Sequence, residues 1–173
     1  GQRMSKSTGN TLLPDELFSG NTDKLEKGFA PTVVRFFMMQ AHYGSQLDFS
    51  NDALVAAEKG YNRLMEALKK LDKLQAGNGD TKFNVADWRK SCYAAMNDDF
   101  NSPILISQLF EAVRFINAAD EKNCYLSAED LQLLKDTIHA FVFDVLGLQN
   151  SAEEKGGDKL DEVMNMLIQM RAK

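Results

Sequence analysis

The sequence predicts an all-α fold, an antiparallel bundle of about five helices preceded by an N-terminal loop segment. Three observations support this prediction. Apolar residues recur at steps of three and four along most of the chain after Pro31, capping and turn residues separate these stretches, and no stretch shows the alternation of a convincing β-strand. Hydrophobic residues make up 44% of the 173 residues, which is enough for one continuous core.

The first predicted helix begins at Pro31, because proline is well tolerated in the first turn of a helix. Apolar residues leave it little polar face, so we expect a central and buried helix. They are Val33, Val34, Phe36, Phe37, Met38 and Ala41. The second helix, from Asn51 to Leu74, repeats apolar residues like a heptad seam and should be a long antiparallel partner. The seam consists of Leu54, Ala57, Tyr61, Leu64, Leu68 and Leu71.

Two more helices follow a break at residues 77–80, where the sequence reads GNGD. The first runs from Asn84 to Asn97. Its apolar stripe contains Val85, Trp88, Cys92 and Ala95. In the second, Ser102 can cap the N-terminus and Pro103 fits the first turn. Its apolar face contains Ile106, Leu109, Phe110 and Val113.

The last helix of the predicted bundle begins at Ser127, which with Asp130 has the short spacing of a capping box. Gly147 can end this helix in a left-handed conformation. The expected apolar face contains Leu131, Leu134, Ile138, Phe141, Val142 and Val145.

The two ends of the chain differ from this bundle. Residues 1–30 are expected to form a loop and connector with two short turns, LPDELF and DKLEKG, and residues 31–150 the bundle. Residues 151–173 are expected to contain a charged linker, SAEEKGGD, and the start of a truncated C-terminal helical region. The apolar residues of that region are Leu160, Val163, Met164, Leu167 and Ile168.

Composition limits the possible partners. The formal net charge of −5 excludes a basic field over the whole chain, so any RNA contact must be local or shared. No stretch is long and apolar enough to predict a membrane span, and residues 1–15 lack the pattern of a signal peptide. We therefore expect a cytoplasmic protein without a membrane partner. Cys92 and Cys124 lie near no histidine, so no metal site is expected, and His42 and His139 are expected to be core or boundary imidazoles.

The first ten residues, GQRMSKSTGN, combine small hydroxyl side chains and glycine with the cations Arg3 and Lys6. Hydroxyls and backbone N–H groups can donate to phosphate oxygens, while an ammonium neutralises charge on a leaving pyrophosphate. The stretch lacks the GxxxxGK frame of a Walker A loop. The composition of the stretch therefore predicts a mobile phosphate clamp that is not a Walker A loop.

RMSKS resembles the KMSKS signature of class I aminoacyl-tRNA synthetases, and its surroundings are similar to the version in cysteinyl-tRNA synthetases. Two later stretches resemble the same family in the same order: VRFFMMQAHYGSQLDFSNDAL, and MNDDFNSPILISQLFEAV with its DDFNTP-like start. The likeness extends from Gly1 to Lys173. It implies a fragment that runs from the signature loop through the C-terminal-side helical domain.

The resemblance implies an enzyme that activates cysteine with ATP and transfers it to tRNA(Cys), and that is generally monomeric. In that family the HIGH signature and a zinc site lie upstream of this segment, so the chain alone should be inactive. The five signature positions fall on Arg3, Met4, Ser5, Lys6 and Ser7, which would bind ATP. Lys6 falls on the phosphate-contacting position and is the expected catalytic residue.

The sequence departs from the family pattern at Arg3 for the usual lysine, at Thr8 for a common leucine, and at Gly44 for an arginine that often follows His-Tyr. The last departure puts one contact with tRNA in doubt.

Several alternatives stay open from the sequence alone. The first ten residues could be a disordered basic tail, and His42 and Tyr43 could serve helix packing or contact RNA. Lys69, Lys70 and Lys73 fit a solvated helix face or an edge that faces RNA. A stand-alone helical-bundle adaptor that binds a partner helix is the alternative function.

Overall fold

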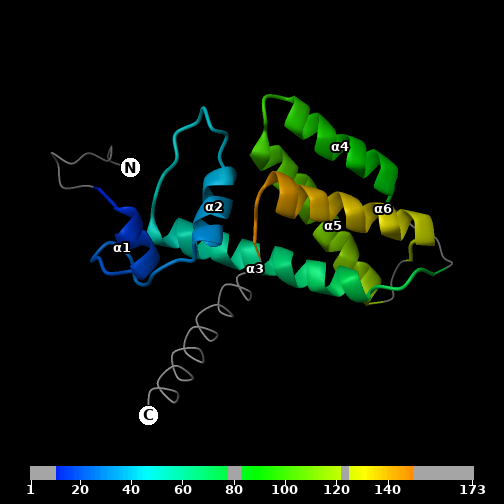
Figure 1. The fold of residues 1–173 in the computed structure, drawn as a ribbon, viewed down its shortest axis with the longest axis horizontal. Coiled ribbons are helices and arrows are strands. Elements are labelled where there is room, and N and C mark those ends of the chain that lie inside the picture. The colour runs from blue at the N-terminus through cyan, green and yellow to red at the C-terminus, as the bar shows by residue number, and fades with distance from the viewer. Residues whose placement is uncertain (1–10, 78–82, 122–124, 150–173) are drawn as a thin grey trace, which may run out of the picture.

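The computed structural model describes residues 11–77, 83–121 and 125–149. Within these ranges the fold is all-α and contains no β-strand, as predicted (Figure 1). The helices are α1 (Pro14–Ser19), α2 (Pro31–Met39), α3 (Asn51–Lys73), α4 (Val85–Asn97), α5 (Ser102–Asp120), α6 (Ala128–His139) and the π-helical segment η2 (Ala140–Val145). In this described part no helix is long and apolar enough to cross a bilayer.

The central element is α3, a helix of 23 residues that spans the bundle (Figure 1). It packs against α2 and α5, while α4 packs against α5 and α6. The predicted seam of α3 is confirmed, since each of its residues is at most 4% exposed. Burial of each of its leucine side chains contributes roughly 1.5–3 kcal/mol, so this seam holds much of the bundle together.

Tyr61, in the middle of α3, is fully buried. Its ring meets Phe36 of α2 edge to face with centroids 6.1 Å apart. Its hydroxyl donates a hydrogen bond to the backbone carbonyl of Gln149, beyond the end of η2. A buried tyrosine hydroxyl needs such a partner. Tyr61 therefore ties α2 and the segment after η2 to the same point of α3.

The prediction that the helix beginning at Pro31 is central was wrong in part. Five residues of α2 are buried, but α2 lies at one end of the bundle and Met38 is 48% exposed (Figure 1). The outward positions of α2 are Pro31, Arg35 and Met38, which the neighbouring helices leave exposed.

Side chains cap the N-termini of α3, α4 and α6, and the cap of α6 by Ser127 was predicted. Ser127 accepts a hydrogen bond from the Asp130 N–H at 3.1 Å, and Ser50 and Asn84 cap α3 and α4 in the same way. The α5 cap differs from the prediction, because Asn101 accepts from the N–H of Ile104 and Ser102 is already helical. The Ser102 hydroxyl instead donates to the carbonyl of Met39 at 2.9 Å, joining α5 to the end of α2.

The predicted apolar face of the last helix was wrong at one residue. Val145 is 48% exposed, and Leu146 is buried in its place. The reason is the π-helical segment η2, in which the Leu146 N–H donates to the carbonyl of Phe141, five residues back. A π turn adds one residue, so the next inward position moves by one. Gly147 then closes the helix with a φ of 61°, as predicted.

This register generates a stability prediction. Leu146→Ala should lower the free energy of unfolding by about 2–5 kcal/mol, because it leaves a cavity in the core. The matched change Val145→Ala should alter it by no more than about 0.5 kcal/mol, since that side chain is exposed. Urea unfolding of both variants measures the difference. A larger loss from Val145→Ala would mean that the segment is an uninterrupted α-helix.

Candidate functional site

The predicted phosphate-binding residues lie outside the described part of the chain. These are Arg3, Met4, Ser5, Lys6 and Ser7, so their placement stays a prediction. The predicted linker and terminal helix of residues 151–173, and Cys124, also lie outside it.

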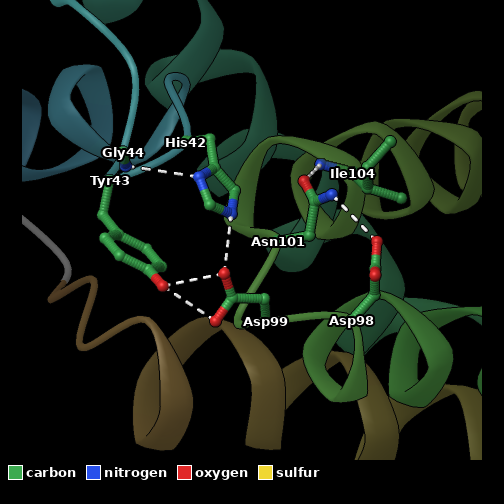
Figure 2. A network of polar contacts seen from close by, with 7 residues as sticks. All are labelled: His42, Tyr43, Gly44, Asp98, Asp99, Asn101 and Ile104. Carbon is green, nitrogen blue, oxygen red and sulfur yellow. Dashed lines mark hydrogen bonds and ion pairs between the residues drawn. The ribbon is translucent and has the colours of Figure 1, made fainter.

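Among the described residues, the two later stretches that carry the resemblance meet each other. Tyr43, after α2, donates its hydroxyl proton toward the Asp99 carboxylate, with both oxygens 2.8 Å away. Asp99 lies in the turn between α4 and α5, and its Oδ2 is 3.9 Å from Nε2 of His42 (Figure 2). We call these three residues the His42–Tyr43–Asp99 cluster.

Local contacts set the geometry of the cluster. The Gly44 N–H donates to Nδ1 of His42 at 3.2 Å, and the imidazole stacks on the Tyr43 ring with centroids 4.6 Å apart. Because Nδ1 accepts, a neutral imidazole carries its proton on Nε2, the nitrogen that points toward Asp99 (Figure 2).

The turn between α4 and α5 has an unusual backbone. Asp99 and Phe100 have φ values of 50° and 52°, in the left-handed region that residues with a side chain rarely adopt. Such residues cost roughly 1–2 kcal/mol each and persist only where surrounding contacts fix them. Here the backbone N–H of Asn101 donates to the carbonyl of Ala95 at 3.1 Å, and its side chain both caps α5 and donates to Asp98 (Figure 2).

The His42–Tyr43–Asp99 cluster joins two segments at the protein surface. The distance of 3.9 Å between His42 and Asp99 is too long for a hydrogen bond, and both Tyr43 and Asp99 are exposed. Asp98 and Asp99 also place two carboxylates in this turn, which disfavours phosphate binding. The two alternatives for His42 and Tyr43, helix packing and contact with RNA, stay predictions.

The sequence did not identify Asp99 as the partner of Tyr43, because the two residues lie 56 positions apart. The sequence showed only that both stretches resemble the same family. That resemblance does not say whether the two stretches contact each other in the fold.

Cys92 lies on the buried stripe of α4 and is 0% exposed, as the sequence predicted. Burial raises the pKa of its thiol to about 12, with a further contribution from the charge of Glu111. A thiol with such a pKa is a poor nucleophile at neutral pH. The described residues also hold no group of three or more His, Cys, Asp or Glu side chains arranged to bind a metal ion.

Comparisons with known proteins agree with the resemblance. The profile of the DALR domain matches residues 92–169. A protein of Bacteroides thetaiotaomicron named cysteine–tRNA ligase is 47% identical across 100% of this chain, which covers 36% of that protein. Proteins of the same name from Parabacteroides distasonis and Chlorobaculum tepidum are 43% and 33% identical across 99% of the chain. The chain spans about a third of the length of these relatives.

The cluster predicts the titration of Tyr43. The hydrogen bond to Asp99 raises the pKa of this phenol above its ordinary value of 10.0, with smaller contributions from desolvation and the carboxylate charge. Because the folded pKa is raised, the contact stabilises the fold fully below pH 10.0 and loses this effect as pH rises through the folded pKa.

Asp99→Asn should therefore lower the pKa of Tyr43, because the charge is lost and the amide is a weaker acceptor. NMR titration of the Tyr43 ring carbons measures this change. The control is Asp98→Asn, a neighbouring carboxylate that binds Asn101 and should leave the Tyr43 titration unchanged. Equal effects of the two variants would show that general charge, and not this contact, sets the pKa.

A second prediction concerns Cys92. In a Cys124→Ser variant, Cys92 should not react with a disulfide reagent at about pH 8, because its thiol is buried and protonated. The same variant unfolded in urea should react with one equivalent. Rapid reaction of the folded variant would show that α4 opens readily.

Proposed function

The chain is homologous over its whole length to the cysteine–tRNA ligases, and on this premise we propose that it is the tRNA-binding and ATP-phosphate-binding part of such an enzyme. The whole enzyme would join cysteine to ATP to form cysteinyl-adenylate and pyrophosphate, and then transfer the cysteinyl group to tRNA(Cys). The observation that carries this proposal is the identity of 47% along 100% of the chain.

The proposal divides the chain into parts. Residues 1–30 would supply the phosphate loop and its connector, residues 31–150 the helical domain that contacts tRNA, and residues 151–173 the linker to a further helical region. The match to the DALR domain over residues 92–169 supports a shared role for α5, α6 and the segment that follows them. The enzyme would act as a cytoplasmic monomer.

The loop would act on charge that develops during adenylate formation. When the cysteine carboxylate attacks the α-phosphorus of ATP, the bond to pyrophosphate breaks and negative charge grows on the leaving group. The Lys6 ammonium would neutralise this charge, and Ser5, Ser7 and backbone N–H groups would donate to phosphate oxygens. Arg3 would present a planar fork of donors where the family has a point charge. Met4 would complete the loop at the remaining signature position.

The parts of the reaction outside this loop belong to other regions of the enzyme. The pocket for adenine and cysteine, and the zinc site implied by the family, would lie outside this chain. The chain by itself should therefore bind tRNA weakly and show no cysteine-dependent pyrophosphate exchange.

The proposal predicts the effect of Lys6→Ala in an enzyme that contains this chain and the remaining length of its relatives. The rate of adenylate formation should fall by roughly 100- to 1,000-fold, because one preorganised donor to the transition state is lost. The dissociation constant of ATP should change far less. Single-turnover kinetics separate the two quantities.

Arg3→Lys is the matched control, since it restores the usual cation of the signature and should keep most of the rate. An unchanged chemical rate in Lys6→Ala with weaker ATP binding would make Lys6 a simple binding residue. Failure of the unaltered enzyme to form cysteinyl-adenylate would overturn the proposed function.

A further inference from the structure

The outward side of α4 forms a groove that the function described so far does not use. Its lining residues are Ala86, Arg89, Lys90, Tyr93, Ala94 and Asn97 of α4, and Leu133 of α6. The α4 residues recur at helical spacing opposite the buried stripe that contains Trp88 and Cys92. The groove thus runs along the exposed side of α4 and is bordered by Leu133 of α6, and we call it the α4 groove.

The charge of the α4 groove is positive, although the chain as a whole has a net charge of −5. Arg89 and Lys90 line it, and no carboxylate does. Asp87 lies beside it and is 3.0 Å from the Lys90 ammonium, with these side chains 64% and 79% exposed. Such an exposed pair contributes little stability, so Lys90 can exchange Asp87 for another anion at little cost. On α6, the carboxylates of Asp130 and Asp136 accept hydrogen bonds from Ser127 and Gln132, and neither carboxylate lines the groove.

Tyr93 holds Arg89 in place. The Arg89 guanidinium lies over the Tyr93 ring, 5.4 Å from its centroid, and the ring meets Phe141 edge to face at 5.2 Å. Phe141 is itself buried in the core. A long arginine side chain is therefore partly preorganised before any ligand arrives, which lowers the entropy cost of binding.

We propose that the α4 groove binds the phosphate backbone of tRNA, with Arg89 and Lys90 each contacting a phosphate and Tyr93 positioning Arg89. This inference rests on the proposed function and assigns a surface to its tRNA contact. Phosphate contacts come mainly from arginine and lysine and supply most of the sequence-independent affinity. Small side chains at Ala86 and Ala94 leave room for a backbone to approach.

Two other surfaces fit a phosphate backbone less well. The turn between α4 and α5 carries the carboxylates of Asp98 and Asp99. On α3, Lys70 is bound to Asn117 at 2.8 Å and lies 3.6 Å from Asp120. Lys69 and Lys73, exposed on the same helix, offer a matched pair of cations for comparison.

The test is a titration of fluorescein-labelled tRNA(Cys) transcript with this 173-residue chain at several salt concentrations between about 50 and 200 mM. The double variant Arg89→Ala/Lys90→Ala should weaken binding. It should also make the slope of log K against log salt less negative by about 1.4 to 1.8, as expected for two lost phosphate contacts. Alanine keeps helix propensity, so α4 should stay folded, which circular dichroism checks.

Tyr93 is tested by two variants. Tyr93→Leu should weaken binding by about 2- to 5-fold through loss of the cation–π contact, while Tyr93→Phe should restore it. A residue needed only for packing would not show this difference once both variants are shown to be equally folded.

The control variant is Lys69→Ala/Lys73→Ala, which removes the same charge from α3 and should leave the salt dependence near that of the unaltered chain. If the unaltered chain binds and Arg89→Ala/Lys90→Ala binds equally well, the α4 groove is not the RNA surface. A loss confined to the control would place RNA on α3. If the unaltered chain binds no tRNA at any of these salt concentrations, the proposed tRNA contact of the chain fails, and this inference fails with it.

Discussion

Burial of the α3 seam is the constraint on which the remaining structure depends. One face of this helix of 23 residues is almost completely removed from water, and α2 and α5 pack on it. Within the seam, Tyr61 combines a large apolar ring with a hydroxyl that must be satisfied inside the protein. The ring packs against apolar partners, and the hydrogen bond from the hydroxyl to the Gln149 carbonyl also fixes the position of the chain after η2.

The π-helical segment makes that position possible. An uninterrupted α-helix would direct Val145 inward, whereas the extra residue of the π turn directs Leu146 inward. Gly147 then reverses the chain in a left-handed conformation, and Leu148 becomes fully buried. These steps bring the Gln149 carbonyl to Tyr61. A local irregularity of the helix is thus compensated by one hydrogen bond and two buried leucines.

The bundle separates two kinds of surface. The turn between α4 and α5 is acidic and strained, and it is fastened to the segment after α2 by Tyr43 and Asp99. The outer side of α4 is basic, and its arginine is oriented by an aromatic ring supported from the core. The acidic turn and the basic outer side thus lie at neighbouring parts of the same helix.

The sequence predicted the helices α2 to α6, most of their buried faces and the left-handed end at Gly147, because apolar period, caps and glycine act over a few neighbouring residues. It predicted α1 only as a short turn, and it did not predict the π-helical segment η2. It also indicated the family, but the roles of Arg3 to Ser7 remain predictions. The folded structure was needed to establish four features: the exposure of Met38, the capping of α5 by Asn101, the shift from Val145 to Leu146, and the contact of Tyr43 with Asp99. Each of these depends on which helix covers which side, and that arrangement is set by contacts between residues far apart in the chain.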